Sequence, residues 1–189
     1  MNRLKALFII LIPSLILVAI VTFGFLKEDK KNIGVNNNFA LGEIPKYFDG
    51  ELIMEATSGN EVNLQKLKGK IVLIDFWSSW CAPCIAEAET LASTYDRWND
   101  YDVEFVGIAI WDTEPEVSNF IKKYNINYPI VIDDFGQIAV DFGVAAIPEK
   151  ILIDKNGKIV KKILGPSSSK DLNNLIAEIS ENSLDLSIY

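Results

Sequence analysis

The chain of 189 residues contains no histidine and only two cysteines. These absences exclude the usual zinc sites, which need about four cysteine, histidine or carboxylate ligands. Covalent haem attachment through C-x-x-C-H is excluded because Ile85 stands at the histidine position. A copper site built from C-x-x-x-C and a distal histidine is excluded on both counts. We therefore expect neither a bound metal nor a cofactor.

Basic residues are in the minority. The chain has 18 lysines and arginines against 26 aspartates and glutamates, a net charge of −8. Without Arg3 and Lys5, 16 basic residues remain and the net charge of the rest is −10. An acidic surface disfavours binding to nucleic acid and to anionic lipid headgroups. We therefore expect a solvated acidic surface and no nucleic-acid partner.

One long apolar segment stands at the N-terminus. The uncharged run from Ala6 to Leu26 has 21 residues, and a helix needs about 20 to cross a bilayer core. No small-residue cleavage site of the A-x-A kind follows, which favours an uncleaved signal anchor over a cleaved signal peptide. Flanking charges are nearly balanced and do not set its orientation. We expect a stub at 1–5, a transmembrane anchor at 6–26, a flexible tether at 27–42, a folded domain at 43–181 and a frayed tail at 182–189.

The two cysteines stand where the spacing of apolar residues changes from that of a strand to that of a helix. Ile71–Trp77 is a β-branched apolar run interrupted only by Asp75, typical of a strand buried on both faces. Pro83 suits a first helical turn. Beyond Cys84, apolar residues recur at helical spacing, namely Ala88, Leu91, Tyr95 and Trp98. Cys81 and Cys84 therefore lie where a strand gives way to a helix.

This position favours thiol chemistry. The thiolate is the reactive form of cysteine, and a helix N-terminus lowers a cysteine pKa from about 8.5 into roughly the 3.5–7.5 range. We expect Cys81 to be the exposed attacking thiolate, and Cys84 to resolve the mixed disulfide by closing a Cys81–Cys84 bond. The pattern predicts thiol–disulfide exchange rather than an inert structural pair.

Strand and helix patterns alternate through the rest of the domain. Such alternation is typical of βαβ crossovers, and Asn156-Gly157 is typical of a hairpin turn between antiparallel strands. The sequence therefore predicts an α/β fold with a central mixed sheet flanked by helices. Strands are expected at 51–55, 61–64, 103–110, 128–132, 151–153 and 159–164, and helices around 117–124, 134–143 and 172–179.

The segment Ile74–Cys84, which reads IDFWSSWCAPC, resembles the active-site segment of the thioredoxin superfamily. Within it, the chain most resembles membrane-anchored thiol–disulfide oxidoreductases of the CcmG/DsbE, ResA and TlpA type, which serve cytochrome c maturation. The resemblance spans about Leu41 to Ile179. It implies a thioredoxin-like fold with an N-terminal β-hairpin extension, anchored in the inner (cytoplasmic) membrane. The stub would be cytoplasmic and the catalytic domain periplasmic.

The resemblance also implies partners and a substrate-binding edge. Electrons would come from a membrane thiol reductase of the DsbD/CcdA kind and pass to a disulfide-containing protein, apocytochrome c. The pattern Gly-Val-x-x-x-Pro-Glu at 143–149 is closer to CcmG than to thioredoxin. It implies a cis peptide bond at Pro148, with the backbone of Ile147 pairing with the incoming chain. Trp80, beside Cys81, is expected to contact partners.

Two carboxylates are candidate proton acceptors. Asp75 matches the buried aspartate of thioredoxin, where CcmG, ResA and TlpA commonly have asparagine. Because burial raises a carboxyl pKa, Asp75 is predicted to accept the proton of Cys84; the alternative is a charged, hydrogen-bonded aspartate at a strand end. Glu87 matches the active-site glutamate of ResA, and its alternative is a carboxylate favoured by the helix N-terminus.

Two other functions stay open on the sequence alone. The chain fits a general disulfide reductase with other protein substrates, and it fits a non-redox module that holds apoproteins. The direction of electron flow depends on the reduction potential of the Cys81–Cys84 pair.

Overall fold

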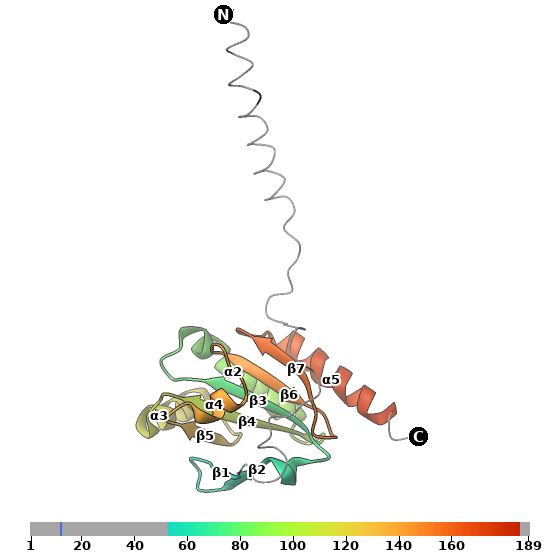
Figure 1. Ribbon diagram of the computed structural model, residues 1–189, viewed down its shortest axis with the longest axis horizontal. Coiled ribbons are helices and arrows are strands. Elements are labelled where there is room, and N and C mark those ends of the chain that lie inside the picture. Colours follow the sequence, from blue (N-terminus) through green and yellow to red (C-terminus); the bar gives the residue numbers. More distant parts are fainter. Residues whose placement is uncertain (1–11, 13–52, 186–189) are drawn as a thin grey trace, which may run out of the picture. The chain divides into compact units, whose positions relative to one another are not determined.

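A computed structural model of the protein describes Ile12 and residues 53–185 (Figure 1). Among these residues, no helix is both long enough and apolar enough to cross a membrane. The stub expected at 1–5 and the tether at 27–42 lie outside the described residues, as does the anchor at 6–26 apart from Ile12. These assignments stay predictions.

The central sheet has five strands in the order β5-β4-β3-β6-β7. Neighbours β3, β4 and β5 are parallel, whereas β6 and β7 are antiparallel additions. The predicted mixed sheet is therefore confirmed. Every residue of β3 is buried because it is the central strand of a sheet covered on both faces. The bounds are β3 (Ile71–Trp77), β4 (Val103–Ile110), β5 (Ile130–Asp133), β6 (Glu149–Ile153) and β7 (Ile159–Leu164).

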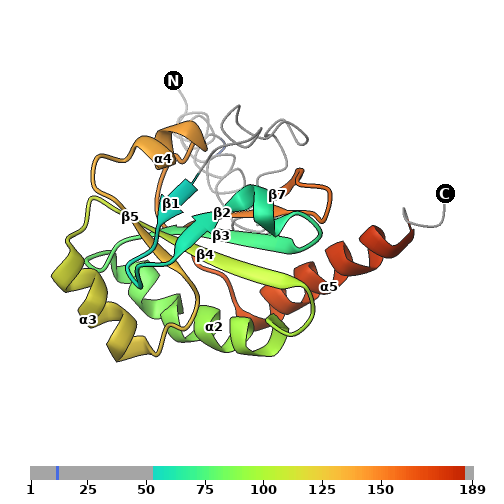
Figure 2. The same cartoon turned by 90° about the horizontal axis from the view of Figure 1, so that it is seen from below.

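Helices cover both faces of this sheet (Figure 2). One face packs against α2 (Ala82–Trp98), α3 (Glu114–Tyr124) and α5 (Ser169–Asp185). The opposite face packs against α4 (Gln137–Asp141) and the N-terminal hairpin. Helix α5 includes residues 182–185, which were expected to belong to a frayed tail.

The expected N-terminal hairpin is present within the described residues. Strands β1 (Ile53–Glu55) and β2 (Glu61–Asn63) are antiparallel, and a 3-10 turn, η2 (Leu64–Leu67), follows. The hairpin joins the edge of the main sheet, because Thr57 N–H donates to the carbonyl of Ile130 at 2.8 Å. Its apolar side chains pack on the sheet face away from α2, and its role as a structural extension stays a prediction.

Strand directions bring the two halves of the candidate site to one edge. The carboxyl end of β3 runs through residues 78–80 into α2, and the antiparallel β6 begins beside that end, with Phe76 paired to Glu149. Pro148, directly before β6, therefore lies at the sheet edge from which Cys81 leaves. Parallel strands β4 and β5 end at this edge too.

Candidate active site

Cys81 and Cys84 form a disulfide at the start of α2. Cys81 is the N-cap residue, and its Sγ accepts the backbone N–H of Cys84 at 3.3 Å. Pro83 lies in the first turn of α2, where a backbone N–H has no partner within the helix, so its absence costs no hydrogen bond. An ionised Cys81 would lie at the positive end of the helix and beside an N–H donor, an arrangement that stabilises a thiolate.

The prediction that Cys81 is exposed is wrong for this disulfide form. Cys81 is only 5% exposed and Cys84 only 3%. The Cys81 sulfur is turned inward by its bond to Cys84 and by the N–H it accepts. The exposed positions of the motif are Trp80, Ala82 and Pro83. A partner would therefore meet these residues first.

The cis-proline segment lies on the β6 side of the site. The Ile147–Pro148 peptide bond is cis, as the resemblance implies. Its position is fixed by a bond from Gly165 N–H to the Pro148 carbonyl at 2.8 Å, and Ile147 packs against both core clusters. The pairing of Ile147 with a substrate chain stays a prediction.

Glu87 forms a buried ion pair with Lys150 of β6. The Glu87 carboxylate also accepts the Ser167 N–H at 2.8 Å, while Lys150 Nζ donates to the Gly165 carbonyl at 2.9 Å. Burial raises the pKa of Glu87, and the bond and charge of Lys150 oppose that rise. Glu87 belongs to the second turn of α2. The alternative, a carboxylate favoured by the dipole at the helix N-terminus, requires a place in the first turn and therefore does not fit. The pair joins α2, β6 and the β7–α5 loop.

Asp75 lies on the same face of the sheet as this ion pair. It is paired in register with Lys150, and residues two apart on β3 share a face, so Asp75 faces α2 as Leu73 and Trp77 do. Within the described residues its buried Oδ1 has no hydrogen-bond partner, which contradicts the hydrogen-bonded alternative.

Burial raises the pKa of Asp75 to about 7, an effect that Lys150 opposes and Glu87 reinforces. The buried Tyr128 is affected by the same charges. Burial raises its pKa well above 10, and Asp75 and Glu87 raise it further. A carboxyl group that titrates near neutral pH can both take and release a proton under physiological conditions. This is the property required of a proton acceptor for Cys84.

A second buried ion pair lies on the other face of β6. Glu149 and Lys162 approach to 2.5 Å, and both side chains are almost fully buried. Lys162 Nζ donates to the Gly143 carbonyl at 2.6 Å, and Glu149 accepts the Ala145 N–H at 3.2 Å. Both contacts hold the loop that carries Pro148.

Lys150, Glu149 and Lys162 were missed as site residues. Their sequence signal is that Glu149 and Lys150 open an otherwise apolar strand, where a buried charge requires a partner. Which carboxylates and ammonium groups pair is set by register across β3, β6 and β7, and the sequence pattern does not fix that register.

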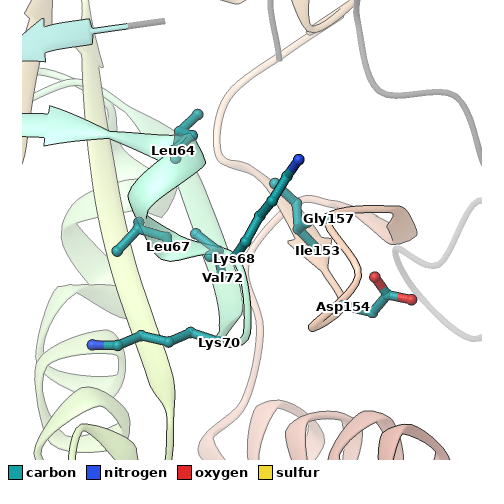
Figure 3. Close-up of a pocket in the computed structure, with 8 residues that line it drawn as sticks. All are labelled: Leu64, Leu67, Lys68, Lys70, Val72, Ile153, Asp154 and Gly157. Carbon is teal, nitrogen blue, oxygen red and sulfur yellow. The ribbon is translucent and has the colours of Figure 1, made fainter. Parts of the chain in front are cut away.

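A small hollow of about 20 Å³ lies at the far end of the sheet (Figure 3). It is lined by Val72 of β3, Ile153 of β6 and residues of η2 and the β6–β7 turn. This space holds about one water molecule. Val72 and Phe76 are four residues apart on β3, roughly 13 Å, so the hollow is separate from the disulfide.

Comparison with known proteins gives the same picture. The Redoxin family profile matches residues 42–178. The thiol-disulfide oxidoreductase ResA of Bacillus thuringiensis subsp. konkukian is 31% identical over 156 residues, covering 82% of this chain and 83% of that protein.

Two solved structures are also similar. A thioredoxin family thiol:disulfide interchange protein from Chlorobium tepidum TLS gives a TM-score of 0.65 at 26% identity, covering 69% of this chain and 94% of that one. StoA from Bacillus subtilis gives a TM-score of 0.59 at 28% identity, covering 65% and 93%. The thioredoxin-like fold predicted from the active-site segment is confirmed.

Proposed function

This chain belongs to the redoxin family of thiol-disulfide oxidoreductases, and we propose that it is a membrane-tethered, extracytoplasmic reductant of protein disulfides. The observation that carries the proposal is the Cys81–Cys84 disulfide at the N-terminus of α2, beside a cis-proline segment. The apolar run at 6–26 supports the membrane tether, with the catalytic domain on the periplasmic side.

The reaction transfers two electrons to the substrate. The Cys81 thiolate attacks one sulfur of the substrate disulfide, forming a mixed disulfide and releasing the first substrate thiolate. Cys84 then loses its proton to Asp75 and attacks Cys81 Sγ. The Cys81–Cys84 bond forms, the mixed disulfide breaks, and the second substrate thiolate leaves.

Asp75 suits this step because its carboxylate lies on the α2 face and has a raised pKa. Glu87 is a weaker candidate for the acceptor, since its carboxylate is engaged by Lys150 and by the Ser167 N–H. Trp80, Ile147 and Pro148 are the residues proposed to contact the substrate. Reduction of the oxidised enzyme by a membrane thiol reductase of the DsbD/CcdA kind completes the cycle.

The proposed substrate is apocytochrome c, whose haem-attachment cysteines must be reduced before ligation. Support comes from the resemblance of residues 74–84 and 143–149 to reductases that serve cytochrome c maturation, and from the similarity to ResA. Deleting the gene should lower the level of c-type haem proteins and leave other extracytoplasmic disulfide proteins intact. A broad loss of disulfide reduction would instead indicate a general reductase.

The decisive measurement is the midpoint potential of the Cys81–Cys84 pair against glutathione buffers. A reductant should lie near roughly −270 mV, whereas a value near roughly −120 mV would make the protein an oxidant. Cys81→Ser should abolish turnover, and Cys84→Ser should trap the mixed disulfide with substrate. Full activity of Cys81→Ser in vivo would favour a non-redox binding module.

A further inference from the structure

Exposed aromatic side chains gather next to the disulfide. Trp80 and Trp111 are each 59% exposed, and Phe135 is 92% exposed. They follow β3, β4 and β5 respectively, where these parallel strands end at one edge of the sheet. Exposed apolar residues that stand alone need no explanation, whereas a group of them beside a reactive site indicates a contact surface.

These three residues are here called the aromatic edge (Trp80, Trp111 and Phe135), and two contacts link their positions. Trp80 Nε1–H donates to the Trp111 carbonyl at 3.1 Å. A Cβ added at Gly136 would lie 2.8 Å from Trp111 Nε1, so the Trp111 indole covers Gly136, the residue after Phe135. The edge therefore runs from the residue before Cys81 to the β5–α4 turn.

Polar contacts hold this edge in place. The Asp112 carboxylate accepts the Ser79 N–H at 2.5 Å and the Ser79 hydroxyl at 3.0 Å. The Ser78 hydroxyl donates to the Ile110 carbonyl at 2.6 Å. Trp111 has φ +49°, in the left-handed region that bulky residues rarely adopt. Burial of the indole does not offset this strain, and strained residues with exposed side chains are typical of functional sites.

The surroundings of the aromatic edge are acidic. Residues 111–121 and 133–143 contain six carboxylates and no lysine or arginine. Asp112 and Asp133 accept backbone N–H groups, but Glu114 and Asp134 are exposed. Of the two lysines in the last turn of α3, Lys123 lines a hollow together with Glu116 and with Ser79, the neighbour of Trp80, so one ammonium group stands beside the exposed carboxylates.

We propose that the aromatic edge docks the segment of the substrate chain that flanks its disulfide, and that this segment carries apolar and cationic side chains. Apolar side chains would pack on the indoles, and lysine or arginine would gain from the ring faces and the nearby carboxylates. The proposal rests on the reductase function. It defines the substrate class as a basic, apolar-flanked disulfide in an extended polypeptide.

The test uses the full-length chain, reduced with dithiothreitol and desalted, in single-turnover reactions stopped by acid and read by mass spectrometry. Three disulfide peptides share one Cys-Ala-Ala-Cys core and differ in their flanks, which are Lys-Phe, Glu-Phe and Lys-Ser. We expect the second-order rate constant for the Lys-Phe peptide to exceed that for the Glu-Phe peptide about tenfold at low salt. This preference should shrink as ionic strength rises.

Variants assign the preference to the aromatic edge. Trp111→Gly suits the positive φ and should lower the Lys-Phe rate constant about fivefold, because the peptide's Phe loses the indole on which it packs, with a smaller effect on the Lys-Ser peptide. Glu114→Gln with Asp134→Asn should reduce the preference for Lys-Phe over Glu-Phe about threefold. The matched controls are Tyr101→Gly, an exposed aromatic at the other end of the sheet, and Glu178→Gln on α5. Both controls should keep the preference.

Three results would overturn the docking proposal. The first is equal rate constants for the three peptides, and the second is an equal loss for all three in Trp111→Gly. The third is light scattering in which Trp111→Gly turns a dimer into a monomer, since a second copy would then occupy the surface. Reduction of hydroxyethyl disulfide by the wild-type chain is measured in parallel. Failure there would contradict the reductase function itself rather than the docking surface.

Discussion

Strand β6 begins with two neighbouring charges that face opposite sides of the sheet. Lys150 pairs with Glu87 on the α2 face, and Glu149 pairs with Lys162 on the α4 face. Both ion pairs are almost fully buried, yet their surroundings differ. The Lys150 pair shares its face with a third ionisable group, Asp75, whereas the Glu149 pair bonds to the backbone of the cis-proline loop.

The different surroundings indicate a different role for each of the two buried ion pairs. On the α2 face, two carboxyl groups face one ammonium group, and burial, reinforced by Glu87 and opposed by Lys150, raises the pKa of Asp75 to about 7. On the α4 face, an ammonium and a carboxylate fix the positions of Gly143 and Ala145. We therefore assign the first pair to the proposed proton transfer, and the second to holding the loop proposed to contact the substrate.

The largest expected effect comes from removing Lys150. Lys150→Met leaves the carboxyl groups of Asp75 and Glu87 without a counter-ion in an apolar site, whereas Lys162→Met leaves only Glu149 without one. Losing one partner of a buried pair lowers the free energy of unfolding by about 3–5 kcal/mol, and we expect Lys150→Met to lose more than Lys162→Met. Urea unfolding at pH 8 measures both. Adding Glu87→Gln to Lys150→Met should restore part of the loss; an equal or larger loss in Lys162→Met would contradict the comparison.

The next effect is the pH dependence of stability in the oxidised protein. Asp75 titrates at about 7 when folded and near 3.8 when unfolded, so the folded state binds the proton more tightly. The free energy of unfolding should therefore fall as pH rises from about 4 to about 7, by on the order of 4 kcal/mol. Asp75→Asn should flatten this slope, leaving the smaller contribution of Glu87. A slope unchanged by Asp75→Asn would place the titrating group elsewhere.

A kinetic effect should follow. Asp75→Asn should slow resolution of the mixed disulfide by about a hundredfold, the lower end of what general acid–base groups contribute. Glu87→Gln should slow it less, since Glu87 is held by Lys150 and by the Ser167 N–H. Stopped-flow decay of a mixed disulfide at Cys81 measures both rates. Equal slowing in the two variants would contradict the assignment of Asp75 as the proton acceptor and of Glu87 as only the ion-pair partner of Lys150.

The smallest kinetic effect belongs to the α4 face. Glu149→Gln keeps an acceptor for the Ala145 N–H but removes the charge that pairs with Lys162. We expect KM for a disulfide peptide to rise about threefold, less than 1 kcal/mol, because the loop before Pro148 shifts. The change in KM should exceed the change in the rate of resolution. A larger change in resolution than in KM would assign Glu149 to the proton-handling group instead.

Much of the fold follows from local patterns. The buried run 71–77, the strand 103–110 and the turn at Asn156-Gly157 all lie where the sequence predicts them, because apolar period and turn chemistry act over short distances. Boundaries are less well predicted. Helix α3 begins at Glu114, before its apolar stripe, because Pro115 and the acidic residues of the first turn favour a helix start.

The sequence by itself determined the chemistry of the site. Two cysteines at a strand-to-helix junction, with no histidine and no third cysteine anywhere in the chain, favour thiol–disulfide exchange over metal binding. Asp75 was also found from the sequence, through the resemblance to thioredoxin's buried aspartate and its place in an apolar run, where a carboxyl group has to be desolvated.

Only the tertiary structure decided which charges meet. Lys150 faces Asp75 because β6 is antiparallel to β3 in one particular register, and it reaches Glu87 because α2 packs on that face. The exposure of the aromatic edge likewise depends on three strand ends meeting at one side of the sheet. Burial and partner choice are properties of the packed molecule, since electrostatic and hydrophobic energies depend on neighbours that are distant in the sequence.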